Sequence, residues 1–198
     1  MTKDDLIFYG RGIMFDFLFR KKKRAVPGLT YAATPSVHAL LSPSEPAKLG
    51  RAAPGTQIRY DPKLVVQLKH EHQALLNLFV ATQSAFMEED LHAVVAHLEA
   101  FRIAIQSHLL KESVRLYIYL EHQLAGDETS YQMVHDFRYE MDGIGKAVTG
   151  FLTKYKNLDT DINLVASFGP DLDAVGKVLV SRIQREEATL YPLYAPGY

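Results

Sequence analysis

Cysteine is missing from this 198-residue chain, and its absence removes several kinds of chemistry at once. Without thiols the chain can form no disulfide, offer no thiolate nucleophile and hold no zinc ribbon or iron–sulfur cluster. The lack of disulfides fits a reducing compartment. The chain is nevertheless long enough to bury a core without such cross-links.

Net charge and long apolar runs are lacking as well. The formal charge is −1 at pH 7, so the chain has no global attraction for nucleic acid, and we expect no nucleic-acid partner. No apolar run approaches the roughly 20 residues of a membrane-spanning helix. The N-terminal apolar stretch precedes its basic run, whereas in a secretory signal it would follow. We therefore expect a cytoplasmic protein.

Motifs of the common enzyme classes are also absent. The sequence contains no glycine-rich phosphate loop, no G-x-S-x-G nucleophile elbow and no dinucleotide-binding fingerprint. We therefore expect a binding or regulatory protein and not an enzyme. Oxygen or peroxide chemistry is the least favoured class, because it would need a redox metal with an open coordination position.

The first 60 residues do not have the pattern of a packed domain. Residues 1–24 combine an aromatic, apolar stretch with a basic run that ends at Arg24. This composition suits peripheral contact with a membrane through residues 6–24, or docking on a protein partner, and both interpretations stay open. Residues 25–60 are rich in proline, glycine and alanine with little periodicity, which predicts an extended linker.

From residue 61 onward the pattern is helical. Asp61 and Pro62 form a start signal, because aspartate is favoured at the N-cap and proline at the first helical position. Apolar residues then recur at helical spacing in four stretches, approximately 61–88, 91–123, 130–155 and 171–190. Gly169-Pro170 is expected to break the chain before the last stretch. The pattern predicts an all-α fold, an antiparallel up-down-up-down four-helix bundle over residues 61–194 with an extended N-terminal tail.

A ten-residue signature occurs twice in this region. The segment His108–Tyr117 is echoed by Arg182–Tyr191, so that a glutamate, a leucine and a tyrosine recur in register while a histidine becomes an arginine. Upstream of each copy, a Glu-His pair ending at His72 is matched by a Glu-Met pair ending at Met141. The sequence therefore predicts two related helical hairpins, the second with its polar inner site partly erased.

Helical spacing places four residues of metal-ligand type inside the predicted bundle. His108 and Glu112 lie one turn apart on an inward stripe. His72 lies mid-stripe on the preceding helix, and Glu186 approaches from the fourth. An unpaired buried carboxylate costs on the order of several kcal/mol, so these groups need a counter-charge. A transition metal is one source, and Arg182, which is expected to reach across the core, is the other.

Several neighbouring residues are weaker candidates for a role at the metal site. Met141 is expected to fill the core. Three histidines lie off the inner stripe and are expected to be solvated: His70, His122 and His135. Glu140 and Glu187 lie at the edge of the inner face, where a helix-surface charge is favoured over a contact with the ligands. Tyr117 and Tyr191 either donate hydrogen bonds to the carboxylates or fill the end of the bundle.

These residues resemble a known family, the hemerythrin-like or HHE cation-binding domain, over roughly residues 61–194. In that family each hairpin supplies one histidine from its first helix and a His-xxx-Glu pair from its second, and together they hold a carboxylate-bridged di-iron centre. The Leu-Tyr-Pro ending at Pro192 is characteristic of the family. Met141 and Arg182 stand where two further histidines would be. The positions that match the pattern are His72, His108, Glu112 and Glu186.

The resemblance implies a degenerate non-haem iron site. Iron held by the four matching residues would be mononuclear, and a di-iron centre is not expected. The implied function is a binding or regulatory protein in the response to iron, oxygen or nitrosative stress, with an unidentified protein partner and homo-oligomerisation as further expectations. The alternative is a metal-free helical interaction module in which Arg182 replaces the metal and bridges Glu112 and Glu186. Its N-terminal segment would dock on a protein or membrane.

Overall fold

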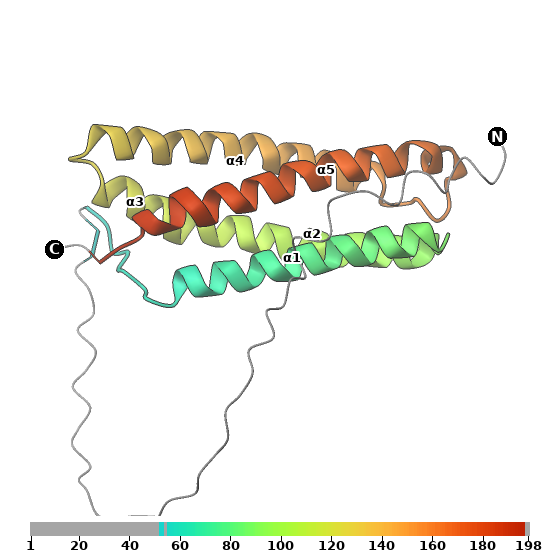
Figure 1. Ribbon diagram of the computed structural model, residues 1–198, viewed down its shortest axis with the longest axis horizontal. Helices are drawn as coiled ribbons and strands as arrows, with labels where there is room; N and C mark the ends of the chain where they lie inside the picture. Colours follow the sequence, from blue (N-terminus) through green and yellow to red (C-terminus); the bar gives the residue numbers. More distant parts are fainter. Residues whose placement is uncertain (1–51, 54, 197–198) are drawn as a thin grey trace, which may run out of the picture. The chain divides into compact units, whose positions relative to one another are not determined.

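The computed structural model describes residues 52–53 and 55–196. The N-terminal segment 1–24 and most of the predicted linker lie outside these residues. The described part is helical, and Figure 1 shows long helices running back and forth beside one another. The elements are α1 (Leu64–Met87), α2 (Leu91–Lys111), η3 (Glu112–Tyr117), α3 (Ile118–Gln123), α4 (Glu128–Lys154), η4 (Ile162–Leu164), α5 (Val165–Arg185), η5 (Glu186–Leu190) and η6 (Tyr191–Leu193).

These elements form the four-helix bundle that the apolar periodicity predicts. The segments α2, η3 and α3 follow one another without a break, as do α5, η5 and η6. Two of the four long helices of the bundle therefore change helix type along their length. The first helix, α1, begins at Leu64, slightly after the Asp61-Pro62 start signal. Asp61 still organises this end, because its Oδ1 accepts a hydrogen bond from the backbone N–H of Lys63 at 2.9 Å.

The expected break at Gly169-Pro170 is wrong. Helix α5 already begins at Val165 and contains Pro170 in its interior. Proline removes one backbone donor and usually disfavours such a position. Here the start of the helix is held by Phe168, which is fully buried and packs edge-on against Phe86 and Tyr155 at centroid distances of 4.8 and 4.9 Å. Tertiary packing therefore outweighs the local signal.

The core consists of two apolar clusters along the length of the bundle. One cluster lies towards the α1–α2 connection and includes Leu75, Leu98 and Phe168. The other lies towards α3 and η6 and includes Leu68 and Met141. Met141 is 5 % exposed, in keeping with the expected role as core filler. Along each helix, the residues of the predicted polar site lie between members of the two clusters. His72, for example, lies between Leu68 and Leu75 on α1.

One close approach between helices depends on a missing side chain. A Cβ at Gly176 of α5 would lie 2.3 Å from Cζ of Phe79 on α1. Glycine at this position therefore lets the two helices approach over the aromatic ring. Within the described residues, no helix has both the length and the apolar composition needed to cross a membrane.

Candidate metal centre

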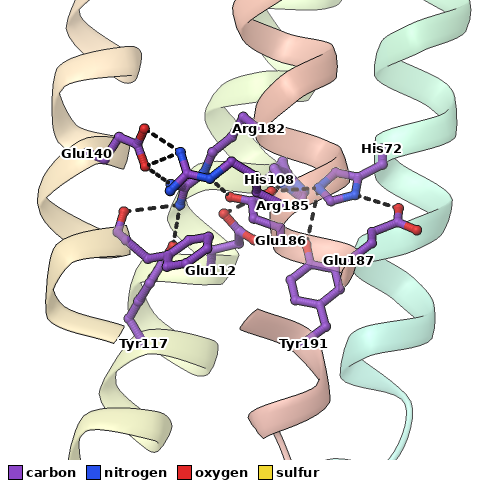
Figure 2. A network of polar contacts seen from close by, with 11 residues as sticks. His72, His108, Glu112, Tyr117, Glu140, Arg182, Arg185, Glu186, Glu187 and Tyr191 are labelled. Carbon is purple, nitrogen blue, oxygen red and sulfur yellow. Dashed lines mark hydrogen bonds and ion pairs between the residues drawn. The ribbon is translucent and has the colours of Figure 1, made fainter. Parts of the chain in front are cut away.

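A layer of buried polar side chains crosses the middle of the bundle. One ligand atom from each member of a four-residue group lies within 4.8 Å of the others, and every member is buried. The group draws on α1, α2, η3 and η5, and Figure 2 shows its side chains converging between these elements. Its members are the four ligand-type residues that helical spacing places on the inner stripes: His72, His108, Glu112 and Glu186.

The two glutamates of this group lie at the starts of the two π-helical segments. Glu112 opens η3 and Glu186 opens η5. In an α-helix, residues five apart are separated by about 140° around the axis, so Glu112 and Tyr117 would not share a face. The i→i+5 hydrogen bonding of a π-segment brings them to the same side, and both are buried. Periodicity did not predict these segments, although the repeated signature marks both.

Each histidine is oriented by a carboxylate behind it. Nδ1 of His72 donates to Oε1 of Glu187 at 2.9 Å, and Nδ1 of His108 donates to Oε2 of Glu71 at 3.1 Å. This assignment places the proton on Nδ1 and turns Nε2 towards the centre of the group, where Nε2 of His72 also lies 3.1 Å from the hydroxyl of Tyr191. The Nε2 atoms lie 3.2 Å from Oε2 of Glu186 and 3.7 Å from Oε2 of Glu112, respectively.

The expectation that Glu187 is a helix-surface charge is therefore wrong. Its carboxylate contacts His72, and Lys69 lies 3.7 Å away on the solvent side. Glu71 has the same role towards His108, and it forms an ion pair with Lys111. Sequence reasoning gave Glu71 no role, although the recurring Glu-His pair contained the signal.

Glu112 is the member of the group whose hydrogen-bonding capacity is least satisfied. Its Oε1 accepts a hydrogen bond from the phenol of Tyr191 at 2.9 Å, while its fully buried Oε2 has no hydrogen-bond partner among the residues that the structure describes. Burial and the neighbouring charge of Glu186 raise the pKa of Glu112 to about 8. Tyr191 also stacks on the His72 ring with an interplanar angle of 10°. The tyrosine thus provides the hydrogen bond to a carboxylate that was one of its two expected roles.

Glu186 and His72 form the charged part of the same group. Burial raises the pKa of Glu186, but hydrogen bonding with His72 and the charge of Arg182 outweigh burial, and the pKa is lowered overall. For His72, burial lowers the pKa, while hydrogen bonds to Glu186 and Glu187 raise it above its ordinary value. The protein without metal therefore favours an ionised Glu186 beside a readily protonated His72.

Arg182 is buried but lies on one side of the group. Its Nε donates to Oε1 of Glu186 at 2.5 Å, and its Nη1 donates to Oε2 of Glu140 at 3.0 Å. Nη2 donates to the hydroxyl of Tyr117 at 2.6 Å and to the carbonyl of Phe137 at 3.1 Å. Figure 2 shows Glu140 on one side of the Arg182 guanidinium and His72 on the other.

Two expectations about the arginine are corrected by this geometry. Arg182 bridges Glu186 and Glu140; among the described residues it has no hydrogen bond or ion pair with Glu112. Its forked donors all have nearer partners, so it does not reach across to the other carboxylate. Glu140 is consequently not a simple surface charge, since it accepts hydrogen bonds from Arg182 and from Arg185.

The remaining histidines considered from the sequence lie away from the centre. His70, His122 and His135 are exposed. The inward stripe thus separated the buried from the solvated histidines correctly.

The donor set fits one transition-metal ion. Ligand atoms about 2.0 to 2.2 Å from a common ion are separated by roughly 3 to 4.4 Å, close to the observed spread. The unpartnered Oε2 of Glu112 is directed into the group, where a bound cation would satisfy it. A second ion does not fit in the same way, because Arg182 and Met141 occupy the corresponding half of the repeat.

A family model described as the hemerythrin HHE cation binding domain matches residues 63–194. This match covers the bundle and all four members of the buried group. A search of curated proteins and a search of solved structures returned no match.

Proposed function

The chain belongs to the hemerythrin HHE cation-binding domain family, and on that basis we propose that it is a regulatory or sensory protein whose bundle holds a single iron ion. The ligands are Nε2 of His72 and His108 with carboxylate oxygens of Glu112 and Glu186. When bound, iron supplies a centre that can change valence and take up a small ligand. This suits a role in the response to iron, oxygen or nitrosative stress in the cytoplasm, without catalytic turnover.

One observation carries the proposal. Oε2 of Glu112 is buried, lacks a hydrogen bond within residues 52–53 and 55–196, and faces three other ligand-type groups. A buried acceptor without a partner costs about 1 to 3 kcal/mol, and a bound cation would remove that cost. The two carboxylates behind the histidines support the same interpretation, because they hold the Nε2 lone pairs towards the ion.

Metal analysis of the full chain tests this function. Protein purified in air and under anaerobic conditions should contain close to one equivalent of iron in at least one preparation. The variant Glu112→Gln, which keeps the side-chain shape but removes the charge, should lose it. The matched control is His135→Ala, which removes an exposed histidine and should retain iron. Less than about a tenth of an equivalent in both wild-type preparations would contradict the proposal.

A second candidate function is a metal-free interaction module. Its support is the permanent charge of Arg182, whose donors all have partners, together with the raised pKa of Glu112, which allows that carboxyl to stay neutral. Docking on a protein or membrane through residues 6–24, or homo-oligomerisation, would then be the activity; that segment lies outside the described residues. The same metal analysis separates the two candidates, because the module needs no ion.

A further inference from the structure

The charges around the buried group do not balance when both histidines are neutral. Five carboxylates belong to the connected network, two within the group and three behind it: Glu112, Glu186, Glu71, Glu140 and Glu187. Four cations pair with them: Arg182, Arg185, Lys111 and Lys69. With Glu112 ionised, as a metal ligand must be, the network therefore carries one net negative charge before the ion is counted.

Only one of these four cations is buried. The Arg182 side chain is 6 % exposed, whereas those of Arg185, Lys111 and Lys69 are 49 %, 25 % and 47 % exposed. Solvent and salt screen the exposed charges strongly and the buried one weakly. Arg182 is also the only one in direct contact with a member of the group, through Oε1 of Glu186 at 2.5 Å. Its charge therefore acts on any ion bound at the other oxygen of the same carboxylate.

We propose that this centre selects divalent over trivalent metal ions, and that Arg182 is the residue that sets the preference. The inference rests on the proposed function, since it requires an ion at the site. A divalent ion leaves the network with one net positive charge, and a trivalent ion leaves it with two. Uncompensated charge is costly inside a protein, so the additional charge weakens binding of the trivalent ion.

The size of the preference follows from Coulomb's law. One unit charge acting across a carboxylate group at an effective dielectric near 20 changes the ratio of trivalent to divalent affinity roughly a hundredfold. For iron, a hundredfold bias towards the ferrous ion corresponds to a potential about 120 mV higher for the ferric/ferrous couple. Arg182 thus tunes valence preference from outside the ligand set.

Two metal ions that keep their valence during the measurement, one divalent and one trivalent, test the preference without electron transfer. Affinities of the metal-free full chain for Mn²⁺ and Ga³⁺ are measured by competition with nitrilotriacetate. The variant Arg182→Gln should raise the Ga³⁺/Mn²⁺ affinity ratio by roughly a hundredfold. The matched control Arg185→Gln removes a guanidinium that binds the same Glu140 but is half exposed, and it should change the ratio less than about threefold.

A second variant should shift the Ga³⁺/Mn²⁺ affinity ratio in the opposite direction. Glu140→Gln removes a negative charge next to Arg182 on a side chain that is 40 % exposed, and it should lower the Ga³⁺/Mn²⁺ ratio severalfold. General damage to the bundle would not raise the ratio in one variant and lower it in the other.

The outcomes are distinguishable. If the wild type binds neither Mn²⁺ nor Ga³⁺, the proposed function fails and this inference fails with it. If the wild type and folded Arg182→Gln both bind Mn²⁺ with the same Ga³⁺/Mn²⁺ ratio, only the inference is overturned. If Arg182→Gln does not fold, Glu140→Gln decides, and an unchanged or increased ratio in that variant overturns the preference.

Discussion

Glu112 is subject to two opposing demands. As a metal ligand it must be ionised, yet in the metal-free protein its complete burial and the adjacent Glu186 favour the neutral form, which is why its pKa rises to about 8. Tyr191 satisfies only one of its oxygens. The carboxylate is thus retained at a cost to the stability of the bundle without metal. Such a cost is expected at functional residues more often than at residues that only pack.

This cost predicts a pH dependence for the metal-free protein. The folded chain holds a proton on Glu112 that the unfolded chain releases near pH 4.5, so this stabilising contribution is complete below that pH and is lost as the pH rises through about 8. Replacement by glutamine keeps a neutral group at all pH values. In EDTA, urea unfolding at pH 8 should show Glu112→Gln more stable relative to wild type than at pH 5, by roughly 1 to 3 kcal/mol.

The comparison between variants isolates Glu112 from other groups that titrate in the same range. His72 contributes in the same direction, since its raised pKa also makes its stabilisation decline with rising pH. His108, whose pKa burial and the charge of His72 lower, contributes in the opposite direction. Both are present in wild type and variant alike. Glu128→Gln, at an exposed carboxylate, is the control, and a pH-independent difference for Glu112→Gln would refute the assignment.

At the scale of elements, the sequence predicted which residues meet but not how the helices bring them together. Histidine and glutamate one turn apart on amphipathic stripes were enough to place the buried group, because helical period fixes direction. The π-segments η3 and η5 were not predictable from period, since a π-turn changes it locally. The reach of Arg182 was misjudged for a related reason: a long, forked side chain takes its nearest acceptors, and spacing alone does not identify them.

Glycine in the helices offers a prediction at the same scale. A Cβ at Gly176 would overlap the Phe79 ring, whereas a Cβ at Gly143 would meet no side chain or neighbouring helix within 4 Å in the described part of the chain. Gly176→Ala should destabilise the protein by about 1 to 3 kcal/mol through overpacking. Gly143→Ala should stabilise it by up to about 1 kcal/mol through helix propensity.

Equilibrium unfolding in urea measures both effects on the same scale. The two variants make the same chemical change in helices of similar character, so Gly143→Ala serves as the matched control for Gly176→Ala. Equal effects of the two substitutions would show that α1 and α5 do not approach as closely as described, or that the Phe79 ring moves aside at little cost.

The bundle consists of two repeated helical hairpins, and the two hairpins have different roles. The first hairpin provides both histidines and Glu112, while the second provides Glu186 and, in place of another ligand, the guanidinium of Arg182. One half therefore provides most of the donors and the other a built-in counter-charge. The ligand set nevertheless spans both hairpins, so an ion at the site would add a further connection to the hydrogen bonds, such as that from Tyr191 to Glu112, that already join the two hairpins at this level.

Connection of the two hairpins predicts that metal binding stabilises the entire fold. An ion that binds only the folded chain, at a free concentration a hundred times its dissociation constant, contributes about 2.7 kcal/mol. For a domain of this size that corresponds to an increase in Tm of roughly 5 to 10 °C. Anaerobic thermal unfolding with buffered Fe²⁺ should show Tm rising with the logarithm of the free ion concentration, and EDTA should reverse the rise. In Glu112→Gln the rise should disappear; an equal rise in that variant would mean that Fe²⁺ acts at some other place on the protein.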